Sequence, residues 1–237
     1  MALEISAEAT KLALNRLRRQ DLIASPARGF YVIVPPEYRS LGCLPADQFI
    51  QALIEQKKDW HYYAGLLSAA QYYGAAHHRP QQFQVILEKN RRPIRCGKVR
   101  VMFIARKLIA KVPTRSFNTP RGEIQVSSPE ATAIDLAGYP QHAGGLDQVA
   151  TILAELAAEI DPSLLPQAAE TAPLPWAQRL GYLLERVEAG HLTESLKAYV
   201  NEHAREYTPL MLGAPIEESP RERGWKIILN SEVESEL

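Results

Sequence analysis

Cationic and amide side chains recur near the start of the chain at a spacing suited to reading a DNA duplex. Lys11, Asn15 and Arg18 follow one another at i, i+4 and i+7, so they share one face of the helix predicted over residues 6–20. An α-helix fits the major groove, where an amide can pair with adenine and a cation with guanine. Arg28 follows on a glycine-flanked turn, from which it could reach a phosphate or the minor groove. The pattern predicts a recognition helix followed by a two-stranded wing.

Six side chains of this segment are candidate DNA contacts, and all are polar or cationic. They are Thr10, Lys11, Asn15, Arg18, Arg19 and Arg28. The alternative interpretation is an amphipathic surface helix followed by an unrelated hairpin, in which the same side chains are merely solvated. Composition and spacing leave both interpretations open.

A second group of cations lies in the middle of the chain, where apolar residues alternate as they do in a β-sheet with one basic face. The group consists of Arg91, Arg92, Arg95, Lys98, Arg100 and Arg106. These side chains could form a second phosphate-contact face, and affinity would then fall with salt at a slope of roughly −0.9 per phosphate neutralised. The alternative is a solvated sheet face that pairs with acidic helices further along the chain.

The zero net charge of the chain hides a strong segregation of charge. Residues 57–123 carry fourteen basic and three acidic side chains, a net of +11, whereas residues 124–237 carry seven basic and eighteen acidic ones, a net of −11. A positive segment of this kind attracts phosphate. Packing of the basic part against the acidic part would neutralise both, and this does not exclude nucleic-acid binding.

The sequence contains none of the common enzyme motifs, including the phosphate loop, GxGxxG, GxSxG and HExxH. His77 and His78 are adjacent and therefore point in different directions, and the other histidines are dispersed, so we expect no metal and no cofactor. Glu130 follows a serine–proline pair and is expected to cap a helix, while Asp135 is expected to be a hydrogen-bonding structural residue. We expect a protein that is not an enzyme. The alternatives are a nucleic-acid-processing enzyme that uses the basic sheet, with Asp135 or Glu130 holding a metal, and a scaffold whose acidic helices bind a basic partner.

Hydrophobic periodicity predicts an α+β fold. Residues 6–20 should form a helix, 22–24 and 30–34 two short strands, and 45–56 and 62–74 two further helices. Alternation then predicts a mostly antiparallel sheet between residues 83 and 126, and the remainder is mainly helical, with helices over 131–138, 145–160, 176–189 and 193–205. We expect a partial winged-helix DNA-binding domain over residues 1–40, joined to a mixed α/β domain over residues 41–237.

Bulk properties favour a reduced, cytoplasmic setting. No stretch approaches the roughly 18 apolar residues of a membrane span, and the first residues lack the apolar core of a signal peptide. Cys43 and Cys96 have no CxxC spacing and form no disulfide framework.

Four motifs in order resemble the AbiEi-type antitoxins. They are the helix over residues 9–22 followed by RGFYV at 28–32, then YYAGLLSAAQYYG at 62–74, SPEATAIDL at 128–136 and QRLGYLLE at 178–185. Each motif alone is weakly specific, whereas four in the expected order cover nearly the whole chain.

This resemblance implies a winged helix-turn-helix joined to a mixed α/β antitoxin domain. The family represses its own operon and counters a nucleotidyltransferase-like toxin in toxin–antitoxin systems of the abortive-infection type. The implied partners are therefore operator DNA and the toxin, the latter without a stable complex, and no membrane. Cooperative self-association on DNA is expected because operators of such regulators are commonly inverted repeats.

One feature departs from the winged-helix pattern. Two helices normally precede the recognition helix and share its core, but only five residues precede Ser6 in this chain. We therefore expect that Leu12, Leu14 and Leu17 lack part of their usual cover, and that the chain as it stands binds DNA poorly. The exposed apolar patch would be covered by a neighbouring molecule or leave the first helix mobile.

Overall fold

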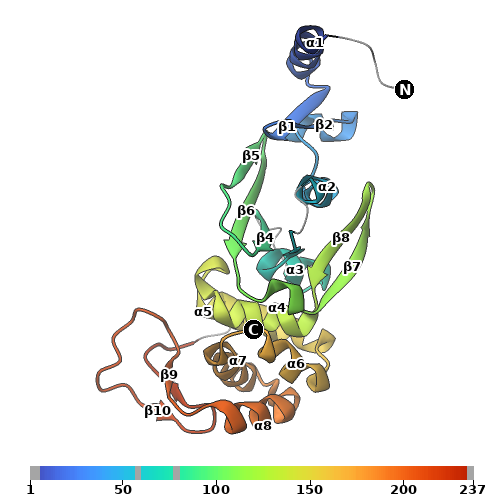
Figure 1. Cartoon of the computed structure of the whole chain (residues 1–237). Helices are drawn as coiled ribbons and strands as arrows, with labels where there is room; N and C mark the ends of the chain where they lie inside the picture. The colour runs from blue at the N-terminus through green and yellow to red at the C-terminus, as the bar shows by residue number, and fades with distance from the viewer. Residues whose placement is uncertain (1–5, 57–59, 77–80, 234–237) are drawn as a thin grey trace.

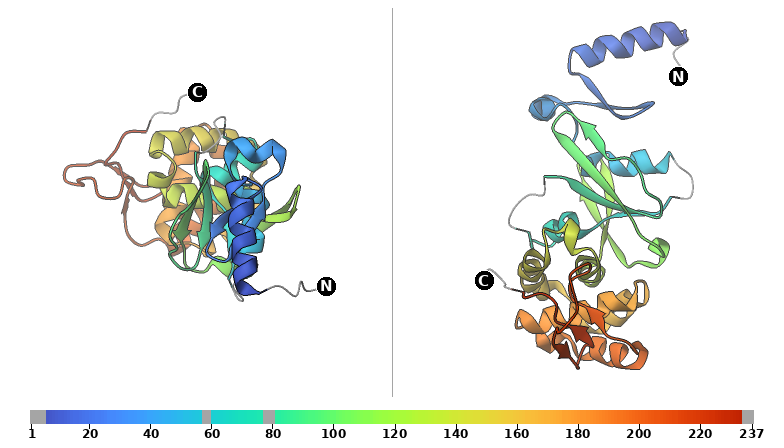
Figure 2. Two further views of the ribbon diagram at one scale, coloured as in Figure 1. Left: turned by 90° about the horizontal axis from the view of Figure 1, so that it is seen from above. Right: turned by 90° about the vertical axis from the view of Figure 1, so that its left-hand side faces the viewer.

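The computed structural model describes residues 6–56, 60–76 and 81–233, and it has the predicted α+β architecture. Three parts follow one another along the long axis of the molecule (Figure 1): an N-terminal arm, a central sheet with its connecting segment, and a layer of helices. The right-hand view of Figure 2 shows the same order from another side. The adjacent histidines His77 and His78 lie outside the described residues.

The N-terminal arm consists of a helix and a hairpin, as predicted. Helix α1 spans Ala7–Arg19, with Ser6 as its N-cap: the Ser6 side chain accepts a hydrogen bond from the Ala9 amide at 3.2 Å. Strands β1 (Ile23–Ala27) and β2 (Phe30–Ile33) pair antiparallel, and an irregular register lies between Ala24 and Ala27. The turn between them is tighter than predicted because β1 continues to Ala27.

A connecting segment runs from the hairpin to the sheet. It contains the short 3-10 helices η1 (Pro36–Leu41) and η2 (Ala46–Gln48) and the helix α2 (Ile50–Glu55). Phe49 packs on Phe30 of the hairpin, with ring centroids 6.3 Å apart. Hairpin, connecting segment and one face of the sheet share a hydrophobic cluster, and this cluster holds the hairpin to the rest of the molecule.

The central sheet has six strands in the order β5-β6-β4-β3-β8-β7. Their bounds are β3 (Tyr62–Ala64), β4 (Phe83–Leu87), β5 (Ile94–Cys96), β6 (Val99–Ala105), β7 (Thr114–Thr119) and β8 (Gly122–Ser127). Pairs β5–β6, β3–β4 and β7–β8 are antiparallel, while β4–β6 and β3–β8 are parallel, so the sheet is mixed. The short helix η3 (Ile109–Lys111) lies between β6 and β7.

Residues 62–74 were predicted as one helix, and this prediction is wrong at its start. Tyr62–Ala64 form β3, and the helix α3 covers Leu66–Tyr72. Gly65 separates the two elements at a point where a Cβ atom would lie 2.6 Å from Cγ1 of Ile86. The pairing of β3 between β4 and β8 buries Tyr63 completely, and this tertiary burial outweighs the helical periodicity of the segment.

The helical layer covers the other face of the sheet. It consists of α4 (Pro129–Gly138), α5 (Leu146–Leu156), α6 (Leu165–Glu170), α7 (Leu174–Arg186) and α8 (Glu194–His203), with short 3-10 helices η4 (Pro140–His142), η5 (Ala157–Glu159), η6 (Pro162–Leu164) and η7 (Gly190–Leu192) between them. A small sheet of β9 (Thr208–Pro209), β10 (Arg221–Glu222) and β11 (Ile227–Ile228) packs beside α7. Helix α4 is buried along its whole length, so its polar residues Glu130, Thr132 and Asp135 are buried together with its apolar ones.

A glycine in each of α4 and α7 allows a tryptophan to pack flat on the helix. A Cβ atom on Gly138 would lie 2.2 Å from the ring of Trp176, and one on Gly181 would lie 2.1 Å from the ring of Trp225. Such distances are far below van der Waals contact, so no larger residue fits at either position without moving a ring.

A buried ion pair joins the sheet to the helical layer. Nε of Arg106, directly after β6, lies 2.9 Å from Oδ1 of Asp135 on α4, and both side chains are almost fully buried. The Tyr63 hydroxyl donates to Oδ2 of Asp135 at 2.7 Å, and Nη2 of Arg106 donates to Thr171 at 3.0 Å. Burial raises the pKa of Asp135, while the Arg106 charge and the Tyr63 hydrogen bond act in the opposite direction.

Removing one member of this pair should cost far more stability than replacing both. Asp135→Ala leaves the Arg106 guanidinium buried without a counter-charge, and the free energy of unfolding should fall by about 3–5 kcal/mol. The double variant Arg106→Met with Asp135→Leu removes both charges and should recover most of that loss. Urea unfolding followed by tryptophan fluorescence measures both values. Equal losses in the single and double variants would contradict the assigned role of the pair.

Candidate nucleic-acid interface

Helix α1 presents its predicted recognition face to solvent. Lys11, Asn15 and Arg18 are all exposed, and α1 contributes no buried residue to the described structure. The basic residues Arg16, Arg18 and Arg19 lie in the last turn of the helix, where they interact favourably with its dipole. The helix stands at the far end of the molecule from the helical layer (Figure 1), so the body leaves this face open to a duplex.

The hairpin supplies a wing that is anchored on one side only. Phe30 and Val32 of β2 point into the core, whereas Tyr31 and Ile33 on its other side are 45% and 65% exposed. Arg28 lies in the turn, exposed, next to Gly29 with its left-handed φ of 77°. The right-hand view of Figure 2 shows the hairpin between α1 and the sheet, so helix and wing form one continuous end of the molecule.

All six predicted DNA-contacting side chains are thus exposed on the arm. Thr10 is partly engaged, since its hydroxyl donates to the Ser6 carbonyl at 3.1 Å. The apolar side of α1 is incompletely covered, as the sequence indicated: Leu12 is 70% exposed, while Leu14 and Leu17 are half-buried. The arrangement brings Lys11, Asn15 and Arg18 onto one ridge.

The second group of cations does not form the basic sheet face expected from the sequence. That face carries Ile86 and Ile104 and is covered by helices. Arg106 in particular is a correction: its guanidinium is buried against Asp135 and is not available to phosphate. Alternation placed Arg106 with the exposed cations, but it lies just beyond the end of β6, where the chain enters the core.

The remaining members of this group differ in their availability. Arg92, Arg95 and Lys98 are exposed around β5. Arg91 is half-buried, with its guanidinium 5.1 Å from the ring centroid of Phe103, and burial lowers its pKa. Arg100 donates to the carbonyl oxygens of Gly97 and Val99 at 2.7 and 3.2 Å. Of this group, Arg92, Arg95 and Lys98 are therefore the side chains that are exposed to a polyanion at this edge of the sheet.

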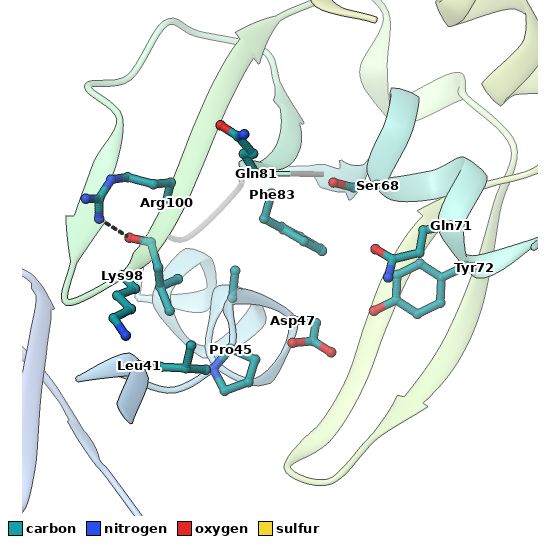
Figure 3. A pocket seen from close by; sticks show the side chains of 12 residues that line it. Leu41, Pro45, Asp47, Ser68, Gln71, Tyr72, Gln81, Phe83, Lys98 and Arg100 are labelled. Carbon is teal, nitrogen blue, oxygen red and sulfur yellow. Dashed lines mark hydrogen bonds between the residues drawn. The ribbon is translucent and has the colours of Figure 1, made fainter. Parts of the chain in front are cut away.

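A cavity of about 400 Å³ opens between the connecting segment, α3 and the sheet. Lys98 and Arg100 lie on one side of it, Phe83 forms its floor, and Asp47 and Tyr72 lie opposite (Figure 3). The dashed line in Figure 3 marks the hydrogen bond that Arg100 donates within its own strand. This volume is within the range of small-molecule sites, and the lining is mixed rather than apolar.

Glu130 and Asp135 are structural in this fold. Glu130 accepts hydrogen bonds from the Ser128 hydroxyl at 2.7 Å and from the Asp161 amide at 2.9 Å, so it joins the start of α4 to the segment before η6. Within the described ranges, no group of three or more His, Cys, Asp and Glu side chains is arranged to hold a metal ion. In the same ranges, no helix is long and apolar enough to cross a bilayer.

Sequence reasoning did not find the buried pair of Arg106 and Asp135, and it did not relate Cys43 to Cys96. In the structure these two thiols are free and buried, and each shifts the pKa of the other. The residues of each pair are far apart in sequence, so no local pattern signals either contact.

Comparisons with known proteins agree with this fold. The family model described as the AbiEi antitoxin C-terminal domain matches residues 63–186, a little over half of the chain. Among solved structures, the crystal structure of the RV2827C protein from Mycobacterium tuberculosis is similar, with a TM-score of 0.65 and 18% sequence identity over 92% of this chain and 78% of that one. At that identity the likeness shows the fold alone. Comparison with curated proteins gives no match.

Substitutions on the exposed ridge should leave stability unchanged. Replacing Lys11, Asn15 and Arg18 together by Ala should change the free energy of unfolding by less than about 0.5 kcal/mol, because no core contact is lost. Phe30→Ala in the hairpin should cost about 3–5 kcal/mol, since it removes a core ring. Urea unfolding compares the two variants. A loss above about 1 kcal/mol in the triple variant would mean that α1 packs on the body.

Proposed function

The chain belongs to the AbiEi antitoxin family, and we propose that it is the DNA-binding repressor of its own operon as well as the antitoxin of a nucleotidyltransferase toxin. Membership gives the role of antitoxin in a toxin–antitoxin pair. The proposal adds the DNA, the site that binds it and the kind of toxin.

The observation that carries the DNA-binding proposal is the ridge of α1. A helix that buries none of its residues in its own chain, carries an amide between two cations and is followed by an anchored hairpin has the layout of a recognition helix with a wing. In this assignment Asn15 reads a base edge, while Lys11 and Arg18 contact phosphates or guanine. Arg28 at the hairpin turn contacts the adjacent backbone or minor groove.

The residues that match the family model suggest which part of the chain binds DNA and which part acts as the antitoxin. Residues 63–186 comprise β3, the rest of the sheet and the helices to the end of α7, and they exclude the arm. We therefore assign DNA binding to residues 1–40 and antitoxin action to the domain of residues 41–237. The exposed cations Arg92, Arg95 and Lys98 extend the phosphate contact only if the duplex reaches past the hairpin, so their contribution should be secondary.

DNA binding should weaken in a specific way when the ridge loses its cations. Lys11→Ala with Arg18→Ala should lower affinity for the DNA upstream of the operon at least about tenfold and reduce the slope of log K against log salt by about 2. Asn15→Ala should instead reduce the preference for that DNA over random sequence, by about tenfold. A gel-shift titration at several salt concentrations measures both effects.

A control variant that loses the same number of cations elsewhere separates the effect of the ridge from the effect of net charge. Arg186→Ala with Arg205→Ala removes two exposed cations from the helical layer and should leave affinity and salt slope unchanged. The recognition-helix assignment is wrong if the ridge variant still binds selectively and as tightly as the wild type. Metal-dependent cleavage of nucleic acid that is lost in Asp135→Ala would favour the alternative of a nucleic-acid enzyme.

Repression and antitoxin action should separate genetically. The triple Ala variant of Lys11, Asn15 and Arg18 should derepress a reporter placed under the operon promoter, yet still rescue growth of cells that express the toxin encoded beside it. The reason is that the ridge lies outside the part that matches the antitoxin model. Loss of rescue in this variant, at an unchanged protein level, would show that antitoxin action needs DNA binding or the arm.

A further inference from the structure

Two cysteines meet where the arm joins the sheet. Cys43 lies in the connecting segment after η1, and Cys96 is the last residue of β5. Both thiols are free and buried, Cys43 completely and Cys96 at 9% exposure. A Cβ atom on Gly42 would lie 3.2 Å from Cα of Gly97, so the residues next to the two cysteines approach closely. Each thiol shifts the pKa of the other, which places the two side chains side by side.

The backbone on either side of this contact is held close by glycines. The Lys98 amide donates to the Leu41 carbonyl at 2.7 Å. A Cβ atom on Gly97 would lie 2.1 Å from the Leu41 carbonyl oxygen and 2.9 Å from Cα of Gly42, so only glycine fits there. A disulfide requires such an approach, because its Cα atoms are about 4.4–6.8 Å apart.

A cavity begins close to the two cysteines. Leu41 and Lys98, each two residues from one of the cysteines, line the cavity shown in Figure 3. The cavity of about 400 Å³ therefore brings solvent to the edge of the glycine contact. Local opening of this edge would let a molecule the size of hydrogen peroxide pass from there to Cys96.

The two sulfurs differ in a way that suits an attacking and a resolving thiol. The hydrogen bond from Cys43 lowers the pKa of Cys96, and the amide of Ser25 and the charge of Arg18 lower it further. The same contact and burial raise the pKa of Cys43, which keeps its proton. Cys96 is thus the better nucleophile, and it is also the less buried of the two.

We propose that Cys43 and Cys96 form an oxidation site, at which a peroxide converts the two neighbouring thiols into an intramolecular disulfide between the connecting segment and β5. The thiolate of Cys96 attacks one oxygen of hydrogen peroxide, the O–O bond breaks, and the departing hydroxide takes a proton to become water. The sulfur of Cys43 then attacks the resulting sulfenic sulfur and loses its proton, the S–O bond breaks, and a second water leaves. The two thiols are oxidised by two electrons, and the peroxide is reduced to two waters.

The disulfide alters the attachment of the arm. Strand β1 contacts β5, and the Ser25 backbone of β1 and the charge of Arg18 of α1 both lower the pKa of Cys96. Closing an S–S bond of about 2.0 Å draws this sulfur toward Cys43 and removes its negative charge, so both interactions with the arm weaken. This consequence rests on the proposed DNA binding: a loosely held arm binds DNA about fivefold more weakly, the factor that corresponds to one lost hydrogen bond.

The experiment treats the reduced chain with hydrogen peroxide and follows both the thiols and DNA binding. We expect loss of both free thiols in each chain, a peptide map in which Cys43 is linked to Cys96 in the monomer, and reversal by dithiothreitol. In the same samples, affinity for the operon DNA should fall about fivefold and recover on reduction.

Two matched variants serve as controls. Cys43→Ser should stop at a sulfenic acid on Cys96 that dimedone traps, whereas Cys96→Ser should resist peroxide and keep its DNA affinity unchanged on exposure to it. Intact thiols in wild type, or linkage only between chains, overturns the oxidation site. A correct linkage with unchanged DNA affinity overturns the coupling to the arm. Absence of DNA binding in both redox states counts against the proposed function, and the peptide map still decides the site.

Discussion

The carboxylate of Asp135 is the point on which the two halves of the fold depend. It lies on a helix with no exposed face, and it accepts from Tyr63 of the sheet while it pairs with Arg106 at the end of β6. A lone charge at this depth would destabilise the protein severely, so the strand, the helix and Thr171 on the adjoining segment must be placed together. The SPEATAIDL segment thus combines a capped start with the residue that locks the sheet onto the helices.

The arm, in contrast, is held without buried charges, and its helix has few contacts with the body. Its hairpin is fixed by apolar side chains such as Phe30 and Val32, but α1 is joined to the molecule chiefly through the hairpin and a few half-buried leucines. Helices in water usually owe their stability to a packed face, and α1 has only part of one. Its Ser6 cap and the three arginines of its last turn supply local stabilisation instead. A helix held in this way is ready to gain its remaining contacts from something outside the chain.

Much of the fold could be predicted because its signals are local. The cap at Ser6, the i, i+4 spacing in α1 and the serine–proline–glutamate start of α4 all depend on residues within one turn of each other. The wrong predictions concern residues whose secondary structure or burial depends on contacts with residues far away in the sequence. Residues 62–64 were predicted as the start of a helix, and their pairing with β4 and β8 makes them a strand instead. Likewise, Arg106 follows an alternating run like any surface cation, and its burial depends on a carboxylate that lies on another element.

Arm, sheet and helices follow one another along one axis. The segregation of charge along the sequence therefore becomes a separation of positive and negative charge along the length of the molecule. The cation-rich sheet lies next to the arm, and the acid-rich helices lie beyond it (Figure 1). The chain therefore carries an electric dipole along its length, and a polyanion exerts a torque on it as it approaches. Each encounter is biased toward arrival with the arm first, and the repelled acidic end points away into solution.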